Sequence, residues 1–167
     1  KSDIASTDSG VMLSRFREMH GDRYKYSLPK KKKYNDKIDI ECKQHGHFKQ
    51  VVRSHLDQKG CPKCSLSKGE NTIALWLERN GFDFEVQFPI NDAENNRTLR
   101  FDFYIAELKM LIEYDGQQHF FPVNFGGMSD DKAQQVHRMT KERDAFKDNW
   151  AKVNKKNLLR ITYLEDV

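Results

Sequence analysis

Three carboxylates lie within two segments whose apolar patterns predict β-strands. Asp102 lies in the first segment, and Glu113 and Asp115 lie in the second. Carboxylates are disfavoured in strands and costly to bury, and two like charges about 4 Å apart repel by about 4 kcal/mol at an effective dielectric of 20. A bound cation would offset that repulsion, so the pattern predicts a Mg²⁺ site. In the alternative interpretation, one or two of these acids face solvent or pair with Arg97 or Arg100.

The cysteines predict a different kind of metal site. The chain has three cysteines, and they form two short knuckles with a histidine, separated by fifteen residues: Cys42-x2-His45 and Cys61-x2-Cys64. Four such ligands satisfy tetrahedral zinc and leave no open position for water, which indicates a structural site. A disulfide would leave one cysteine unpaired. His47 or His55 could replace His45 as the fourth ligand, but the spacing favours His45.

Basic residues are concentrated in the first part of the chain. Residues 1–68 contain 16 Lys and Arg against 8 Asp and Glu, a balance of +8, whereas the remainder has a balance of −4. Four consecutive lysines stand beside tyrosines within residues 24–34, a composition typical of a surface that contacts phosphates. A solvated loop is the alternative for any one lysine. The residues expected to contact DNA are Lys30, Lys31, Lys32, Lys33, Lys49 and Arg53.

No apolar run approaches the length of a transmembrane helix, and no signal peptide opens the sequence. We therefore expect an intracellular protein, in the cytoplasm of a bacterial or phage-infected cell or in another compartment that contains DNA.

The elements that position these residues fall into two modules, 1–68 and 69–167. In the first module we expect a helix at 9–20, with Met12, Phe16 and Met19 on one face. A hairpin of strands 37–42 and 47–53 is expected across the first knuckle, before a polar linker at 65–68.

The second module is predicted to run helix, three strands, helix, strand, which is a mixed α/β (α+β) fold. The first helix, 70–80, ends before Gly81 and has an apolar side formed by Ile73, Leu75, Trp76 and Leu77. The strands are expected at 82–89, 98–106, 109–115 and 158–163.

The second helix of this module begins at Ser129 or Asp130 and runs to about residue 154. Its predicted core stripe consists of Val136, Met139, Phe146, Trp150 and Val153. A polar stripe beside it, at spacings of three and four, consists of His137, Thr140, Asp144 and Lys147. Asp144 and Lys147 therefore either reach the sheet edge near His119 or form a solvated pair.

Both modules resemble known families. Residues 16–64, which contain Ile-Glu-Cys-Lys-Gln-His-Gly-His-Phe and Gly-Cys-Pro-Lys-Cys, look like the zinc-ribbon-like module found beside nucleases in phage and mobile-element proteins. Residues 69–163 resemble the very-short-patch-repair-like branch of the PD-(D/E)xK nucleases, and most closely the homing endonucleases with an E-D-x-H-D signature. The resemblance implies a restriction-endonuclease-like αβββαβ core preceded by a small zinc-binding module.

The signature residues, carried over to this chain, are Glu70, Asp102, a variable position within 113–115, His119 and Asp144. The superfamily pattern would place a lysine two residues after Glu113, where this chain has Asp115. Whether Glu113 or Asp115 is the closer metal partner of Asp102 therefore stays open.

The resemblance implies a role for each residue of the site. Asp102 with Asp115 or Glu113 would hold Mg²⁺, and His119 would take or give a proton near neutral pH. The alternative for the histidine is a hydrogen-bonded structural role.

Three further residues have supporting roles in this scheme. Glu70 would position a water or the metal, or else complement a helix N-terminus. Asp144 would orient the histidine, and Lys147 would contact a phosphate.

We therefore expect a Mg²⁺-dependent endonuclease that hydrolyses phosphodiester bonds in double-stranded DNA, of the homing or mobile-element type. The alternatives are a mismatch- or damage-directed nicking enzyme and a non-catalytic zinc-containing nucleic-acid-binding protein. The sequence does not determine the oligomeric state or the target site.

Overall fold

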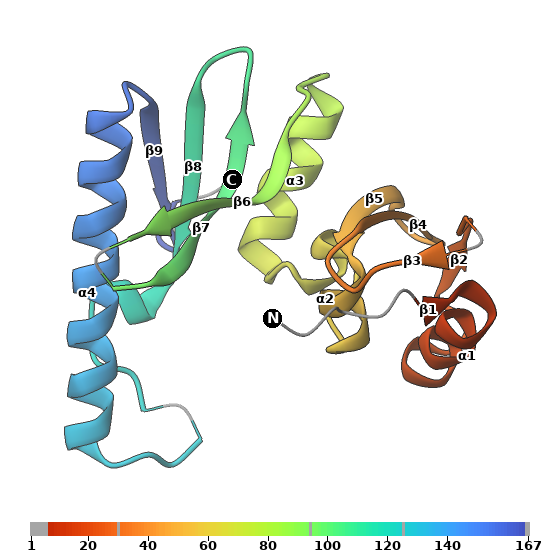
Figure 1. Ribbon diagram of the computed structural model, residues 1–167. Coiled ribbons are helices and arrows are strands. Elements are labelled where there is room, and N and C mark those ends of the chain that lie inside the picture. Colours follow the sequence, from red (N-terminus) through yellow and green to blue (C-terminus); the bar gives the residue numbers. More distant parts are fainter. Residues whose placement is uncertain (1–6, 30, 94, 125, 166–167) are drawn as a thin grey trace. The chain divides into compact units, whose positions relative to one another are not determined.

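The computed structural model describes residues 7–165 apart from residues 30, 94 and 125 (Figure 1). It is a mixed α and β structure that divides into two compact units, Lys1–Ser65 and Leu66–Val167. The division falls slightly before the boundary expected after Lys68. Within the described residues, no helix is both long enough and apolar enough to cross a membrane.

Two α-helices and two small antiparallel sheets make up the first unit. Its elements are β1 (Thr7–Asp8), α1 (Ser9–His20), β2 (Tyr24–Tyr26), β3 (Lys31–Lys32), β4 (Lys37–Cys42), β5 (Gly46–Val51), α2 (Val52–Leu56) and the 3-10 helix η1 (Pro62–Ser65). One sheet has the order β2-β4-β5, and β1 pairs with β3. The predicted hairpin is present, but its second strand ends at Val51, and residues 52 and 53 belong to α2.

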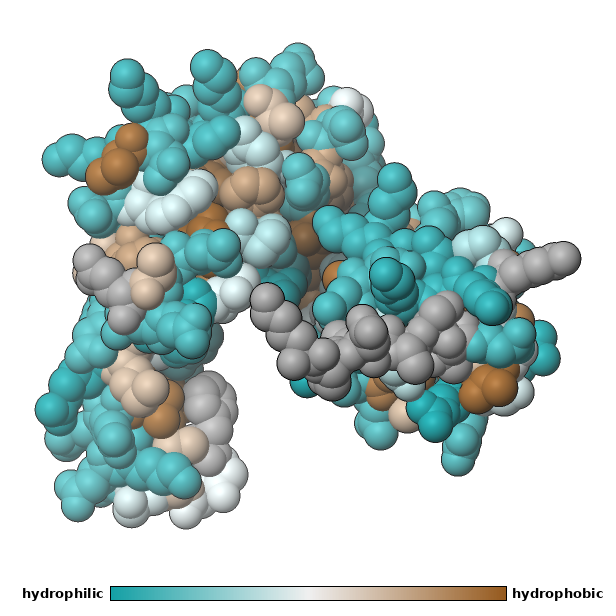
Figure 2. Space-filling model, viewed as in Figure 1, coloured by the Kyte–Doolittle hydropathy of each residue, from teal (hydrophilic) through white to brown (hydrophobic). Residues whose placement is uncertain are grey.

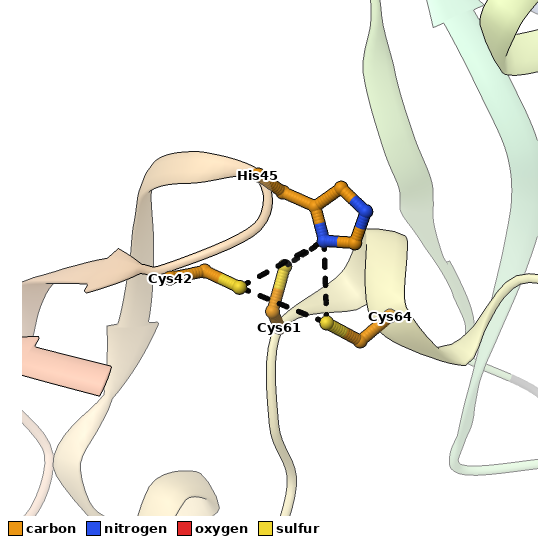
Figure 3. Close-up of side chains that lie close together, drawn as sticks. All are labelled: Cys42, His45, Cys61 and Cys64. Carbon is orange, nitrogen blue, oxygen red and sulfur yellow. Dashed lines mark hydrogen bonds between the residues drawn. The ribbon is translucent and has the colours of Figure 1, made fainter. Parts of the chain in front are cut away.

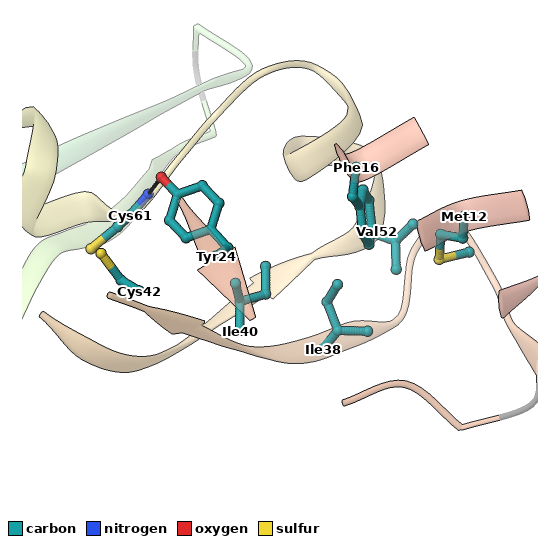
Figure 4. Close-up of a cluster of buried hydrophobic side chains, with 8 residues drawn as sticks. All are labelled: Met12, Phe16, Tyr24, Ile38, Ile40, Cys42, Val52 and Cys61. Carbon is teal, nitrogen blue, oxygen red and sulfur yellow. Dashed lines mark hydrogen bonds between the residues drawn. The ribbon is translucent and has the colours of Figure 1, made fainter. Parts of the chain in front are cut away.

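Helix α1 lays one line of side chains on the core of the first unit. Met12 and Phe16 are buried as predicted, but Met19 is exposed, and His20 is buried instead. His20 stacks on the buried ring of His55, with 3.9 Å between the ring centroids, and its Nε2 lies 2.8 Å from the His55 carbonyl oxygen. Figure 4 shows the core that Met12 and Phe16 join, with residues from β2, β4, α2 and the second knuckle: Tyr24, Ile38, Ile40, Cys42, Val52 and Cys61.

One four-stranded sheet and two α-helices make up the second unit. Its elements are α3 (Lys68–Arg79), β6 (Glu85–Asp92), β7 (Arg97–Ile105), β8 (Met110–Asp115), the 3-10 helix η2 (Gln117–His119), α4 (Asp130–Val153) and β9 (Asn157–Thr162). The sheet order is β6-β7-β8-β9, in which β8 and β9 are parallel and the other pairs antiparallel. The predicted order of elements is confirmed, although β6 begins at Glu85 and not at residue 82.

The sheet register places charged residues of three strands on one face. Phe103 of β7 pairs with Ile112 of β8, so Asp102 and Glu113 are the next positions along the two strands. Glu113 in turn pairs with Arg160 of the parallel strand β9. Because paired positions point to the same face of a sheet, three strands contribute charges to one surface.

Helix α3 begins with a capping box. Ser67 accepts a hydrogen bond from the Glu70 backbone N–H, and the Glu70 carboxylate accepts one from the Ser67 N–H. Gly81 follows the helix with a positive φ of 75°, as its predicted C-terminal position requires. Leu75 and Trp76 are exposed, contrary to the prediction, because the buried face consists of Ile73, Ala74 and Leu77.

The core stripe predicted for helix α4 is confirmed at two of its five positions. Phe146 and Trp150 pack against the core, but Val136, Met139 and Val153 are exposed. Ala133 and Thr140 are buried in the same half of the helix, so this half is covered along another line of residues, and Val136 and Met139 lie beside that line. The fully buried positions carry small or polar side chains: Ala133, Thr140 and Ala151.

Candidate functional site

A four-residue sulfur and nitrogen cluster lies in the first unit (Figure 3). The Sγ atoms of Cys42 and Cys64 are 3.7 Å apart, and His45 Nδ1 lies 3.8 Å from Cys42 Sγ, 3.7 Å from Cys61 Sγ and 3.2 Å from Cys64 Sγ. Zinc with Zn–S bonds of about 2.3 Å in a tetrahedron requires sulfurs about 3.8 Å apart. The cluster is therefore compatible with zinc binding.

The local structure explains why these four residues meet. Cys42 ends β4, and His45 occupies the turn before β5. The Cys64 N–H donates to the Cys61 carbonyl oxygen at 3.0 Å, which closes the second knuckle. Tyr24 fixes that knuckle from the core side, because the Cys61 N–H donates to its hydroxyl at 2.9 Å.

The two other histidines considered as ligands are engaged elsewhere. His47 Nδ1 lies 2.6 Å from the Asp39 carboxylate on the surface. His55 is buried, and its Nδ1 faces Gln50 Oε1 at 2.8 Å and the Lys59 carbonyl oxygen at 3.1 Å. The prediction of His45 as the fourth member of the cluster is confirmed.

A second polar cluster surrounds a hollow of about 530 Å³ in the second unit. Six of the seven residues expected from the sequence to act in catalysis line it: Glu70, Asp102, Glu113, His119, Asp144 and Lys147. Asp115 is not among the lining residues. The structure therefore brings most of the predicted site together from α3, β7, β8, η2 and α4.

Asp102 is the acid with the most perturbed pKa in this hollow. Burial raises its pKa to about 8, and the neighbouring carboxylates of Glu113 and Glu70 act in the same direction. Its Oδ2 accepts one hydrogen bond, from the Tyr114 N–H at 2.7 Å. No lysine or arginine within the described part of the chain forms an ion pair with Asp102, so its charge has no compensating partner.

Glu113 is compensated by a lysine from helix α4. Lys147 Nζ lies 2.8 Å from each carboxylate oxygen of Glu113, which is 2 % exposed. Burial nevertheless keeps the pKa of Glu113 above its usual range. Lys147 therefore pairs with Glu113, and the alternative of a solvated pair with Asp144 is wrong.

Asp115 is compensated by an arginine that the sequence interpretation missed. Arg160 Nη1 lies 2.8 Å and 3.0 Å from the two oxygens of Asp115, and its Nη2 lies 2.8 Å from Asp148. These carboxylates outweigh the effect of burial and raise the pKa of Arg160 further. Arg97, one of the two arginines considered as partners, binds Asp92 instead at 2.7 Å. A single arginine in the largely apolar strand β9 was the signal that could have revealed it.

His119 lies between two carboxylates. Its Nδ1 is 2.9 Å from Asp144 Oδ2 and 3.3 Å from Asp115 Oδ1. Burial alone would raise the pKa of Asp144, but the hydrogen bond with His119 and the nearby Arg160 lower it below its usual range. The ligand atoms of these three residues lie within 4.8 Å of one another, so they are a second group able to hold a metal. Asp102 and Glu113 are not part of that group.

Two more arginines line the hollow without having been predicted. Arg100 lies on β7, and Arg143 lies on α4, where its Nη2 donates to Thr140 Oγ1 at 2.9 Å. Within the described residues, Arg100 forms no ion pair with Asp102, Glu113 or Asp115. The lining thus combines anionic carboxylates with cationic groups that can face an anion.

The basic residues expected to contact DNA all lie in the first unit. Lys31 and Lys32 form β3, Lys33 follows it, Lys49 lies on β5 and Arg53 on α2. Lys30 lies outside the described residues. The other five residues are exposed except for the half-buried Lys32.

Comparison with known proteins reaches the first unit alone. Residues 6–65 match the family described as "Protein of unknown function (DUF723)". Neither the comparison with curated proteins nor that with solved structures yielded a match. Any function of the second unit has to be argued from its own geometry.

Proposed function

We propose that this chain is a Mg²⁺-dependent endonuclease that hydrolyses phosphodiester bonds in double-stranded DNA. In this proposal the second unit is a restriction-endonuclease-like domain of the very-short-patch-repair-like type, and the first unit is a zinc module that binds DNA. The observation that carries the proposal is Asp102, a buried acid that shares a polar hollow with Glu113, Glu70 and a His119–Asp144 pair.

The zinc part rests on the tetrahedral spacing of the cluster in Figure 3. All four ligand positions come from the chain, so the ion would have a structural and not a catalytic role. It would tie the end of β4 to the second knuckle, which lacks regular strands of its own.

The donor atoms around Asp102 suit a hard cation. Asp102, Glu113 and Glu70 supply carboxylate oxygens, which are the ligands that Mg²⁺ prefers. A cation beside Asp102 would also relieve the repulsion that raises its pKa. When bound, Mg²⁺ would polarise a phosphate and lower the pKa of a coordinated water. Of the two acids left open by the sequence, we assign Glu113 to this role, because Glu113 lines the hollow together with Asp102 and Asp115 does not.

The histidine would move the proton. Because Nδ1 of His119 faces the carboxylates of Asp144 and Asp115, that nitrogen carries the hydrogen, and Nε2 is left as the proton acceptor. Asp144 and Asp115 therefore orient the ring, and Arg160 holds Asp115 in place. Lys147, beside Glu113, would contact a phosphate oxygen of the DNA.

The non-catalytic alternative also has an observation in its favour. Lys147 and Arg160 already neutralise Glu113 and Asp115, so two of the strand acids are stable without a metal. Asp102 decides between the two proposals, because its charge has no such partner within the described residues. A protein without catalytic function would gain stability by replacing this acid with an apolar or amide side chain.

The test is cleavage of supercoiled plasmid by the full chain, loaded with zinc, in buffer with Mg²⁺ or in buffer without added Mg²⁺ and without chelator, so that the zinc stays bound. We expect nicked or linear product with Mg²⁺ alone. Asp102→Ala should abolish cleavage while gel-shift binding to the same DNA persists, because it removes the acid and not the basic residues of the first unit. Asp83→Asn, a charge change at an exposed position of the second unit, serves as the matched control. An Asp102→Ala protein that cuts at the wild-type rate would refute the enzyme proposal.

A further inference from the structure

A second hollow, of about 410 Å³, lies in the first unit, away from the zinc cluster. Its lining comes from α1, from the segment between β3 and β4, and from α2 with the residue after it: Arg15, Tyr34, Asn35, Arg53, Leu56 and Asp57. Among these six, Arg53 alone was expected from the sequence to contact DNA. The hollow brings together two guanidinium groups from different helices.

Tyr34 connects the parts of the chain that form this hollow. The Arg53 N–H donates to the Tyr34 carbonyl oxygen at 2.9 Å, which ties the start of α2 to the segment after β3. The Tyr34 hydroxyl accepts a hydrogen bond from Arg15 Nη1 at 3.4 Å. Its ring packs against the hydrophobic core of the unit. Tyr34 therefore holds the guanidinium group of Arg15 through its hydroxyl and the backbone of Arg53 through its carbonyl oxygen.

The charges at the hollow favour an anion. Neither Arg15 nor Arg53 forms an ion pair with any residue that the structure describes, and Asp57 is the one acid in the lining. The three described lysines at 31–33 directly precede Tyr34. Hydrophilic residues cover most of the surface of this unit that is visible in Figure 2. Guanidinium groups without an ion-pair partner, on a hydrophilic surface beside lysines, attract phosphate and bind it through paired hydrogen bonds.

We propose that this hollow binds a phosphate group of the DNA backbone between Arg15 and Arg53, with the Asn35 amide as a further donor. The proposal rests on the proposed DNA binding and adds a defined site to it. A polar ligand is favoured over an apolar one because five of the six lining residues have polar or charged side chains, and a phosphate is favoured because two of these are guanidinium groups. The volume lies in the range of pockets that hold small ligands, about 300–1,000 Å³, and admits a phosphate with its sugar.

The first experiment measures binding of a fluorescent DNA duplex to the full chain, loaded with zinc, over a range of salt concentrations. Arg15→Gln and Arg53→Gln should each weaken binding about ten-fold at low salt and reduce the slope of log K against log salt by about 1. Tyr34→Phe, which keeps the ring but removes the support of Arg15, should cause a smaller loss. Asp57→Asn should tighten binding, because it removes the one anion in the lining.

Arg17→Gln is the matched control, since Arg17 is an exposed arginine on α1 that does not line the hollow. The Arg17→Gln protein should bind DNA with nearly the wild-type affinity, because it loses only a surface charge outside the hollow. Variants at Arg15 and Arg53 that behave like Arg17→Gln, while the wild type binds DNA, would overturn the proposal and leave DNA binding intact.

A second measurement keeps the two proposals separable. Inorganic phosphate, titrated into ¹⁵N-labelled full chain, should shift the Nε–H resonances of Arg15 and Arg53 before those of Arg17. Shifts spread evenly over all arginines would overturn the site. If phosphate binds here but the wild-type protein does not bind duplex DNA, the DNA-backbone proposal fails, and the hollow is a site for free phosphate.

Discussion

At the scale of single residues, Asp102 contributes to the free energy of unfolding by an amount that depends on whether it is protonated. Its pKa rises from the ordinary 3.8 to about 8 on folding, because it is buried beside Glu113 and Glu70. Between these two pH values the native state keeps the proton and the unfolded state loses it. The contribution of Asp102 to the free energy of unfolding is therefore greatest below pH 4 and declines as the pH rises to about 8.

The loss of stability with rising pH predicts how a neutral side chain at position 102 changes the melting temperature. Without added Mg²⁺, Asp102→Asn should raise the melting temperature of the zinc-loaded protein relative to wild type by an amount that grows from pH 5 to pH 8, because the amide cannot ionise. Saturating Mg²⁺ should reduce that difference at pH 8, since the cation stabilises the ionised acid. Thermal unfolding followed by circular dichroism measures both effects. A difference independent of pH would contradict the perturbed pKa.

His119 and Asp144 make a graded pair of predictions. His119→Ala should bind the metal normally and lower the single-turnover cleavage rate by about 10²–10⁴, the usual contribution of a general acid or base. Asp144→Asn should lie between this variant and wild type, because Asp144 acts through the ring at 2.9 Å. Glu142→Gln, at an exposed position of the same helix, is the control. A larger loss for Asp144→Asn than for His119→Ala would show that Asp144 does more than orient the histidine.

At the scale of elements, the Cys42–His45 and Cys61–Cys64 knuckles bring the β4–β5 hairpin together with a segment that contains no strand. Structural zinc in small domains contributes roughly 10–16 kcal/mol of apparent binding free energy. Cys61→Ser should therefore release zinc and unfold the first unit, while the second unit, which has its own core, stays folded. His47→Ala should keep the zinc, because His47 pairs with Asp39 and not with the cluster.

Metal analysis and two-dimensional NMR test this prediction together. Resonances of α3 through β9 should persist in Cys61→Ser, and those of β4 and β5 should collapse. Wild-type protein that contains no zinc after purification without chelator would refute the site.

Helix α4 shows that one element can serve both packing and the site. Phe146 and Trp150 pack against the sheet, while Asp144 and Lys147, one turn apart, reach the residues of β8 and η2. Because both sets lie on neighbouring faces of the same helix, a shift of α4 would change the hydrogen bonds of the site directly.

At the scale of the whole molecule, the two parts of the chain differ in net charge. The first part of the chain is strongly basic, and the second is acidic. A protein that neutralises 6–10 phosphates loses about 10³–10⁵ in affinity between 50 and 200 mM salt. We expect that range for this chain, with the larger part contributed by the first unit.

Replacing Lys30, Lys31, Lys32 and Lys33 by Ala should weaken binding and flatten the salt dependence. The reason is that DNA releases fewer counterions when fewer lysines neutralise its phosphates. Lys152→Ala with Lys155→Ala, two exposed positions of the second unit, should change the slope far less. Titrations by fluorescence anisotropy at several salt concentrations measure both. Equal slopes for the two sets of variants would refute this division between the units.

Local features of the sequence were sufficient to predict the zinc cluster and the order of the elements. The x2 spacing of the knuckles constrains ligands within a few residues. Gly81 marks a helix end through its positive φ, and Ser129 marks a helix start through its side chain, which accepts a hydrogen bond from the Lys132 N–H. The same applies to the acids in strands, because a charge in an apolar run is visible without any knowledge of the fold.

Tertiary structure alone decided which charges meet and which helix faces are buried. Arg160 reaches Asp115 because α4 returns the chain to place β9 parallel to β8, and Lys147 reaches Glu113 from that same helix. The residues of each pair are separated by 45 and 34 positions, so no local pattern relates them. The exposure of Val136 and Met139 likewise depends on which line of residues along α4 the rest of the fold covers, and the periodicity of one helix does not show this.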